Sequence, residues 1–227
     1  MRIGLYGMPT AGKTYILEKV DSIEVMAGSV LLREICPSFD LEDDYGKNMA
    51  REELAKRLLC VDSFIMDGHY AFGDKVAFTD MDGQLYDVIL YLYISPDVLI
   101  KRMRESYKNK KYLSYDIEKW QINEIERLRD YCHKNNKDFY VIDNPKDNFF
   151  TDVTEVVKFI NAIVNGFSCK RFAADCAEKI LNCTDSEEIT LLDGDKTITK
   201  EDSSHAVFGY TTHTVSYTHL TLPTKRI

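Results

Sequence analysis

The N-terminal segment constrains the fold more than any other part of the sequence. The strand-like run RIGLY leads into Gly7-Met-Pro-Thr-Ala-Gly12-Lys13-Thr14, which fits the pattern G-x-x-x-x-G-K-[ST], and the following YILEKV has helical character. Glycines let the backbone wrap around an anion, and the free N–H groups of a helix N-terminus attract one. The sequence therefore predicts a phosphate-binding loop between a first strand and a first helix.

Each polar position of this loop has a predicted part in holding a nucleotide. In this pattern the lysine reaches the outer phosphates and the Ser or Thr hydroxyl binds Mg²⁺. Lys13 is therefore a candidate catalytic residue, and Thr14 is a candidate metal ligand. The residues expected to bind the phosphates are Gly7, Thr10, Ala11, Gly12, Lys13 and Thr14.

Beyond the loop, short apolar runs alternate with amphipathic helical runs as far as residue 165. This alternation is typical of an α/β fold in which a parallel sheet is covered on both faces. We expect a P-loop NTPase fold with a five-stranded parallel sheet and helices on both faces. The strands are expected at residues 1–7, 23–28, 63–67, 86–94 and 138–143, and the helices at 11–20, 29–35, 48–60, 95–106, 115–135 and 151–166.

Three further stretches narrow the class of nucleotide-binding protein. The third strand ends in FIMDGHY, which has a single acidic residue, whereas the corresponding strand of a mechanical ATPase ends in an acidic pair. The N-K-x-D motif by which GTPases recognise the base is absent from the sequence. GSVLLRE follows the second strand, and ISPDVLIKRMR follows the fourth. Together these stretches resemble the nucleoside monophosphate kinases, the group of adenylate kinases and their relatives, over about residues 1–163. This resemblance implies ATP and Mg²⁺ as cofactors, and in-line transfer of the γ-phosphoryl group to a nucleotide or another small molecule.

The resemblance also implies roles for single residues. Asp67 would hold Mg²⁺ through water, although a strand-end acid often only caps the next turn. Arg33 would bind the acceptor's phosphate, unless it is an ordinary solvated arginine. Arg102 would lie over the nucleotide with Arg104 assisting, the alternative being surface ion pairs. Asn144, with Pro145 beside it, would border the adenine.

Two departures from the family pattern bear on the acceptor. The segment that should carry lid arginines has only lysines, which lack the two-pronged fork of a guanidinium; these are Lys108, Lys110 and Lys111. The run FDLEDDYGKN is acidic, so it would repel a polyphosphate, yet it could orient a hydroxyl through Asp40, Asp43 or Asp44. The lysine run is equally consistent with a solvated loop. The acceptor is therefore not necessarily a nucleoside monophosphate.

A second phosphate motif lies near the C-terminal end. LLDGDKTIT resembles the D-x-D-x-T motif of haloacid dehalogenase-like phosphatases, which implies Asp193 as nucleophile, Asp195 as acid/base and both as Mg²⁺ ligands. The remaining residues of that family's site need more chain than follows here, and VSYTHLTLPT resembles a translated sequencing adapter. We expect a kinase-like domain at 1–165, a truncated phosphatase domain inactive by itself at 166–214, and a non-native tail at 215–227.

Bulk properties narrow the remaining choices. The 227 residues carry a formal net charge of −8, which argues against broad binding to nucleic acid. Six cysteines without a CxxC pair, and no long apolar run, predict a reduced cytoplasmic protein that does not enter a membrane. Two alternatives stay open: an enzyme similar to the polynucleotide 5′-kinase/3′-phosphatases, and a nucleotide-binding module without catalysis. The oligomeric state is not predicted.

Overall fold

A computed structural model describes residues 1–143 and 153–183 of the chain. The chain divides into two compact units, residues 1–168 and 169–227. The described part of the second unit is one helix, α8 (Cys169–Asn182). Residues 184–214 of the expected phosphatase domain lie outside the described residues. The described sheet and its covering helices belong to the first unit.

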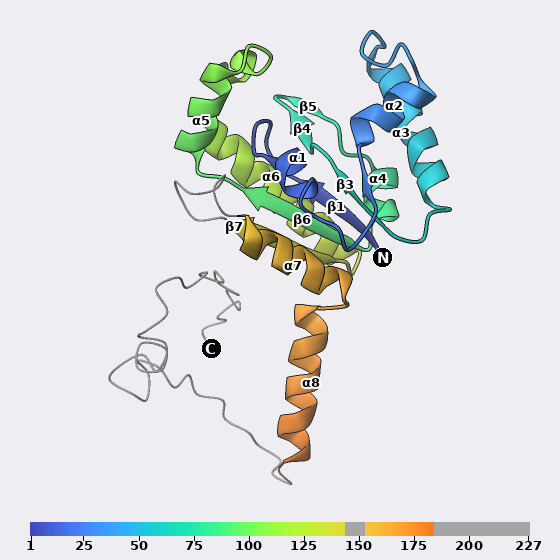
Figure 1. Ribbon diagram of the computed structural model, residues 1–227, viewed down its shortest axis with the longest axis vertical. Helices are drawn as coiled ribbons and strands as arrows, with labels where there is room; N and C mark the ends of the chain where they lie inside the picture. The colour runs from blue at the N-terminus through green and yellow to red at the C-terminus, as the bar shows by residue number, and fades with distance from the viewer. Residues whose placement is uncertain (144–152, 184–227) are drawn as a thin grey trace. The chain divides into compact units, whose positions relative to one another are not determined.

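The first unit is built on a five-stranded sheet (Figure 1). The strand order is β2-β3-β1-β6-β7, and every neighbouring pair is parallel. The prediction of a five-stranded parallel sheet is therefore confirmed. The bounds are β1 (Arg2–Tyr6), β2 (Val25–Met26), β3 (Phe64–Asp67), β6 (Val88–Tyr93) and β7 (Asp138–Asp143).

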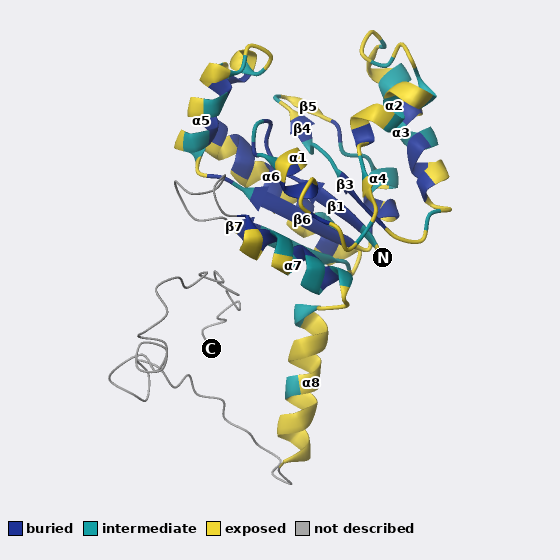
Figure 2. Ribbon diagram, viewed as in Figure 1, coloured by how far each residue is buried: buried dark blue, intermediate teal, exposed yellow. Residues whose placement is uncertain are grey.

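Helices cover both faces of the sheet because the strand side chains alternate between two cores. On β6, Leu90 and Leu92 belong to one core, whereas Ile89 and Tyr91 belong to the other. Figure 2 shows the central strands of the sheet buried and the outer helix surfaces exposed. The first core includes side chains of α1 (Lys13–Leu17), α5 (Pro96–Glu105) and α7 (Thr154–Val164). The second core includes side chains of α3 (Asp44–Leu58) and α4 (Asp80–Leu85), and most apolar residues of α6 (Ile117–Lys134). Helix α2 (Gly28–Ile35) packs against this second core.

Helix α3 begins four residues before the expected start at Asn48. The side chain of Asp43 accepts a hydrogen bond from the backbone N–H of Gly46 at 2.8 Å, which caps the new first turn. The acidic run that could orient an acceptor hydroxyl is thus partly the N-terminus of a helix. There, carboxylates are stabilised by the helix dipole.

A small hairpin after β3 was not predicted. It consists of β4 (Ala71–Phe72) and β5 (Lys75–Val76), which pair antiparallel around Gly73 with φ +66°. Its strands are too short to leave a hydrophobic period in the sequence. A 3₁₀ turn, η1 (Lys110–Ser114), connects α5 to α6 and occupies the expected lid segment. Of the described helices, none combines the length and apolar character needed to cross a membrane.

Candidate functional site

The phosphate loop joins β1 to α1 at the carboxyl end of the sheet (Figure 1). Gly12 has φ +97° and Thr10 has φ +68°, so the loop turns through left-handed conformations that favour glycine. At Gly7 a Cβ atom would lie 2.9 Å from the carbonyl oxygen of Leu92. The neighbouring strand therefore requires glycine at the first position of the motif.

Lys13 lies buried inside the loop that precedes it. Its ammonium donates to the carbonyl oxygen of Gly7 at 2.6 Å and to that of Met8 at 3.3 Å, and it lies 3.4 Å from Nδ1 of His69. Burial lowers the pKa of Lys13 to about 8, while the negative charges of Asp67 and Glu124 oppose this shift. The lysine is thus held at the centre of the loop and retains its charge around neutral pH.

The Thr10 hydroxyl is a second polar group inside the loop. Its oxygen is buried and has no hydrogen-bond partner among the described residues. An unsatisfied buried hydroxyl costs about 1–3 kcal/mol, so its presence calls for a polar ligand. A phosphate oxygen would accept its proton, and a nucleoside triphosphate therefore fits the residues of this loop.

Asp67 lies beside the loop, as the sequence predicts for a residue at the end of β3. It pairs in register with Leu5, and the next N–H, that of Gly68, donates to the Leu5 carbonyl at 2.9 Å. Thr14 lies exposed in the first turn of α1. No group of three or more His, Cys, Asp or Glu side chains suited to a metal occurs in the described residues. Mg²⁺ in nucleotide sites commonly takes one or two protein ligands besides phosphates and water, and Thr14 with Asp67 fits that pattern.

Arg102 contacts the phosphate loop, whereas Arg104 points to a different side of the same helix. Nη1 of Arg102 donates to the carbonyl of Thr10 at 3.2 Å and to that of Ala11 at 3.4 Å. Desolvation lowers the pKa of Arg102 to about 10. Arg104 is exposed two residues further along α5, on a different side of the helix. Of the two candidates, the structure brings only Arg102 to the loop.

Arg33 forms an exposed ion pair within the first unit. Its Nε lies 2.9 Å from Oδ2 of Asp40, and this pairing raises the pKa of the guanidinium and lowers that of the carboxyl group. Asp44 pairs with Lys75 of β5 at 3.0 Å. With Asp43 serving as a helix cap, all three candidate hydroxyl-orienting acids have structural partners.

The three lysines of the expected lid segment lie on the surface. Lys108, Lys110 and Lys111 are exposed, and Lys111 lies over the ring of Tyr112, 5.0 Å from its centroid. Asn144 and Pro145 lie outside the described residues, as do Asp193 and Asp195. Their predicted roles stay predictions.

Two polar residues near the loop were not predicted. His69 is the residue beside the Lys13 ammonium; burial and the charge of Lys13 lower its pKa well below the usual range. Glu124 is buried on α6, and its carboxylate accepts from the Ala71 N–H at 3.1 Å, the Trp120 Nε1 at 2.9 Å and the Tyr91 hydroxyl at 2.7 Å. The only sequence signal was an aromatic-flanked acid on the buried face of a helix.

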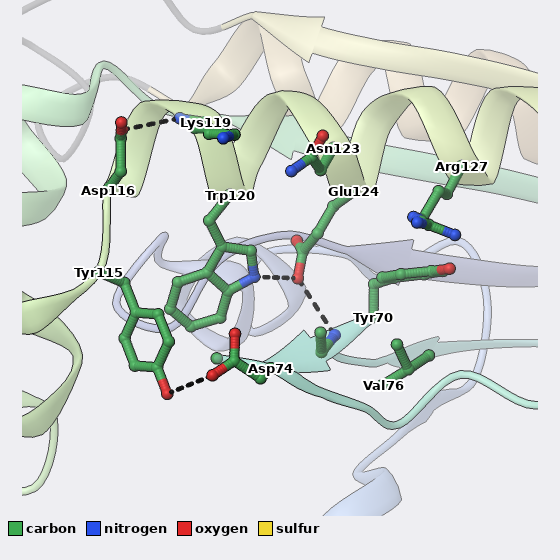
Figure 3. A pocket seen from close by; sticks show the side chains of 12 residues that line it. Tyr70, Asp74, Val76, Tyr115, Asp116, Lys119, Trp120, Asn123, Glu124 and Arg127 are labelled. Carbon is green, nitrogen blue, oxygen red and sulfur yellow. Dashed lines mark hydrogen bonds between the residues drawn. The ribbon is translucent and has the colours of Figure 1, made fainter.

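A cavity of about 380 Å³ opens between the β4–β5 hairpin and α6 (Figure 3). Trp120, Asn123, Glu124 and Arg127 extend from α6 toward the hairpin, and the Tyr115 hydroxyl donates to Asp74 at 3.4 Å. Burial raises the pKa of Glu124, whereas its three donors and the Lys13 charge act against the shift. The remaining lining residues are Tyr70, Ala71, Gly73, Val76, Asp116 and Lys119.

No protein-family model matches the sequence, and comparison with curated proteins gave no match. Among solved structures, a shikimate kinase from Acinetobacter baumannii in complex with shikimate is similar, with a TM-score of 0.50 at 14% identity over 74% of this chain and 95% of that one. A shikimate kinase from Bacteroides thetaiotaomicron (TM-score 0.48, 15% identity, 73% and 98% covered) and a gluconokinase from Sinorhizobium meliloti (0.47, 14%, 78% and 96%) are more distant. The first of these likenesses supports the P-loop kinase fold.

Proposed function

We propose that this chain is a Mg²⁺-dependent kinase that transfers the γ-phosphoryl group of ATP to a small molecule or nucleotide in the cytoplasm. The observation that carries the proposal is the phosphate loop, with the Lys13 ammonium at its centre and the Thr10 hydroxyl without a partner among the described residues. Both groups are suited to the oxygens of a polyphosphate. The likeness in fold to a shikimate kinase supports a small-molecule acceptor.

Different residues in and around the loop would bind the phosphates of ATP and the Mg²⁺ ion. Bound ATP and Mg²⁺ supply the phosphoryl group and neutralise its charge. The backbone N–H groups of residues 7–14 and the Thr10 hydroxyl would bind phosphate oxygens. Lys13 would exchange the Gly7 carbonyl for the outer phosphates. Thr14 and Asp67 would hold the metal, the latter through water, and Arg102 would border the phosphates from α5.

An ADP-release assay tests the proposal. The protein is given ATP and Mg²⁺ with each of three acceptor classes: nucleoside monophosphates, small alcohols and sugar acids, and 5′-hydroxyl oligonucleotides. We expect ADP release with a small molecule, and a fall of about 10³-fold in the Lys13→Ala variant, because a cation at the transferred group is lost. Lys56→Ala, an exposed lysine on α3, is the control. Undiminished turnover in Lys13→Ala would show that the loop is assigned wrongly.

The same assay separates the two alternatives. Release of ADP only with an oligonucleotide would favour an end-processing enzyme similar to the polynucleotide 5′-kinase/3′-phosphatases. Tight ATP binding without turnover of any acceptor would favour a non-catalytic nucleotide-binding module.

The C-terminal motif extends the proposal to a parent protein that both adds and removes phosphate. Asp193 and Asp195 would there bind Mg²⁺ in a phosphatase site. In this chain we expect no phosphatase activity. Asp193→Asn should leave ADP release unchanged, and a loss would show that the motif serves the kinase reaction instead.

A further inference from the structure

We propose that the cavity between the β4–β5 hairpin and α6 binds the phosphoryl acceptor, and that this acceptor is a small polyhydroxylated molecule with one anionic group, such as a sugar acid. The inference rests on the proposed kinase function. It moves acceptor recognition away from Arg33, whose guanidinium is already paired with Asp40.

Two residues, His69 and Glu124, connect the cavity wall with the phosphate loop. His69 is within 3.4 Å of the Lys13 ammonium, and Ala71, two residues later, forms part of the cavity wall. Two residues of extended chain span at most about 7 Å, so this part of the wall lies within that length of backbone from the residue that contacts the lysine. Glu124 provides an independent link, because it lines the cavity and its negative charge acts to raise the pKa of Lys13.

One wall of the cavity presents hydrogen-bond donors. Lys119, Asn123 and Arg127 are spaced four residues apart on α6, so they share one helix face, and all three are exposed. Neither cation forms an ion pair with a carboxylate in the described part of the chain. A guanidinium binds a carboxylate through two parallel hydrogen bonds, which makes Arg127 the anchor for an anionic group.

The opposite wall presents acceptors for hydroxyl groups. Asp74 accepts one hydrogen bond from Tyr115, and a carboxylate has lone pairs for further donors. The oxygens of Glu124 are already engaged by three donors, so this residue shapes the floor rather than contacting substrate hydroxyls. The lining holds two cations and three carboxylates, so it repels a doubly charged phosphomonoester more strongly than a monoanion held by Arg127.

The volume agrees with this class of ligand. At about 380 Å³ the cavity is near the lower end of the range for small-molecule sites, roughly 300–1,000 Å³. A nucleoside monophosphate would need room for a base, a ribose and a dianionic phosphate. The charge distribution and the volume therefore both favour a sugar acid.

Trp120 makes the cavity directly observable, because it is the single tryptophan of the chain and lines the cavity. The protein is titrated with gluconate, glucuronate, sorbitol and AMP while its fluorescence is followed, and the same compounds are tested as acceptors. The Lys13→Ala variant is titrated in parallel, so that binding is measured without transfer. We expect saturable changes with a sugar acid, and weaker or no changes with sorbitol and AMP.

Variants on α6 show where the ligand binds. Arg127→Ala should raise both the Kd and the KM for the sugar acid by about 10- to 100-fold, because a charge-assisted hydrogen bond is lost, and should leave the KM for ATP unchanged. Arg129→Ala, also exposed on α6 but not in the cavity, should change both by less than about 2-fold. Both side chains are exposed, so folding is not at risk.

The outcomes separate this inference from the proposed function. A sugar acid that binds with Arg127 dependence but is never phosphorylated would overturn the acceptor role, and the kinase proposal would then depend on other acceptors. Turnover of AMP, with a KM that rises in Arg33→Ala and not in Arg127→Ala, would overturn the cavity assignment while leaving the kinase intact. No response to either sugar acid would overturn the ligand class.

Discussion

The ammonium group of Lys13 lies 3.4 Å from Nδ1 of His69, so two groups that can carry positive charge meet beside the phosphate loop. Burial and the lysine charge lower the pKa of His69 well below its usual range. The imidazole is therefore neutral near pH 7, and the neighbouring lysine has its own lowered pKa. The site thus contains one buried positive charge, poised for an anion.

The first prediction follows from the cost of burying that charge without a ligand. The pKa of Lys13 falls from 10.5 to about 8, a difference worth about 3 kcal/mol. Below pH 8 the folded state bears this cost in full, and between about pH 8 and 10.5 it is relieved, because the folded protein releases the proton first. Lys13→Met should therefore raise the free energy of unfolding by about 1–3 kcal/mol at pH 7, with a gain that shrinks as the pH approaches 10.5.

Urea denaturation at several pH values measures this effect, with Lys56→Met on α3 as the matched exposed control. The control should show no dependence of the difference on pH. A Lys13→Met variant that is less stable than the wild type at pH 7 would contradict the prediction, since it would mean that the hydrogen bonds to Gly7 and Met8 outweigh burial.

The second prediction concerns the arginine that contacts the loop. Arg102 donates to the carbonyl oxygens of Thr10 and Ala11, so its loss should loosen the loop and remove a cation near the phosphates. We expect Arg102→Ala to weaken ATP binding by about 10-fold or more and Arg102→Lys to restore part of it. Calorimetric titration with ATP checks this. Arg104→Ala on the same helix should differ from wild type by less than about 2-fold, and equal losses in both variants would refute the assignment to Arg102.

The third prediction concerns the buried carboxylate of Glu124. Burial raises its pKa above 4.5, so the stability associated with its neutral form is present at low pH and lost as the pH rises through the folded-state pKa. The substitution Glu124→Gln would keep an acceptor for Ala71 and Trp120 without the charge. Relative to Glu124→Gln, the wild type should lose stability as the pH rises from about 4.5, whereas Glu126→Gln, exposed on the same helix, should track the wild type. Thermal melts of these proteins across this pH range test the prediction. If the melting temperatures of Glu124→Gln and the wild type changed in parallel with pH, the prediction would be wrong.

The central strands of the sheet were predictable because they are buried on both faces and read as continuous apolar runs. VILYLY of β6 is an example: five of its six residues are buried. The phosphate loop was predictable because its spacing is set by backbone geometry, and Gly7 and Gly12 have the conformations that the motif requires. Asp67 follows from its strand, since register with β1 brings it to the loop.

Features that depend on tertiary contacts were not predictable. The β4–β5 hairpin has two-residue strands without a hydrophobic period, so nothing in the sequence indicated that it would form a wall of the cavity. Glu124 occupies a position that a helical pattern would assign to an apolar residue, and only its three donors explain it. Arg33 was placed correctly on α2, yet its partner Asp40 lies in a turn whose course the sequence did not indicate.

The fourth prediction uses the Thr10 hydroxyl, because removing it should have opposite effects on the free protein and on the complex. The oxygen is buried without a partner among the described residues, so Thr10→Val, which keeps the shape, should raise the free energy of unfolding of the ligand-free protein by about 1 kcal/mol. The same change should weaken ATP binding by about 10-fold, because the hydroxyl then has no phosphate oxygen to bind. Thr14→Val is the matched control, since that hydroxyl is exposed in the free protein: stability should stay within about 0.5 kcal/mol while Mg²⁺-dependent ADP release falls. Denaturation and ATP titration of both variants measure the two effects. A Thr10→Val variant that binds ATP as tightly as wild type would mean that the hydroxyl is unsatisfied for a reason other than phosphate binding.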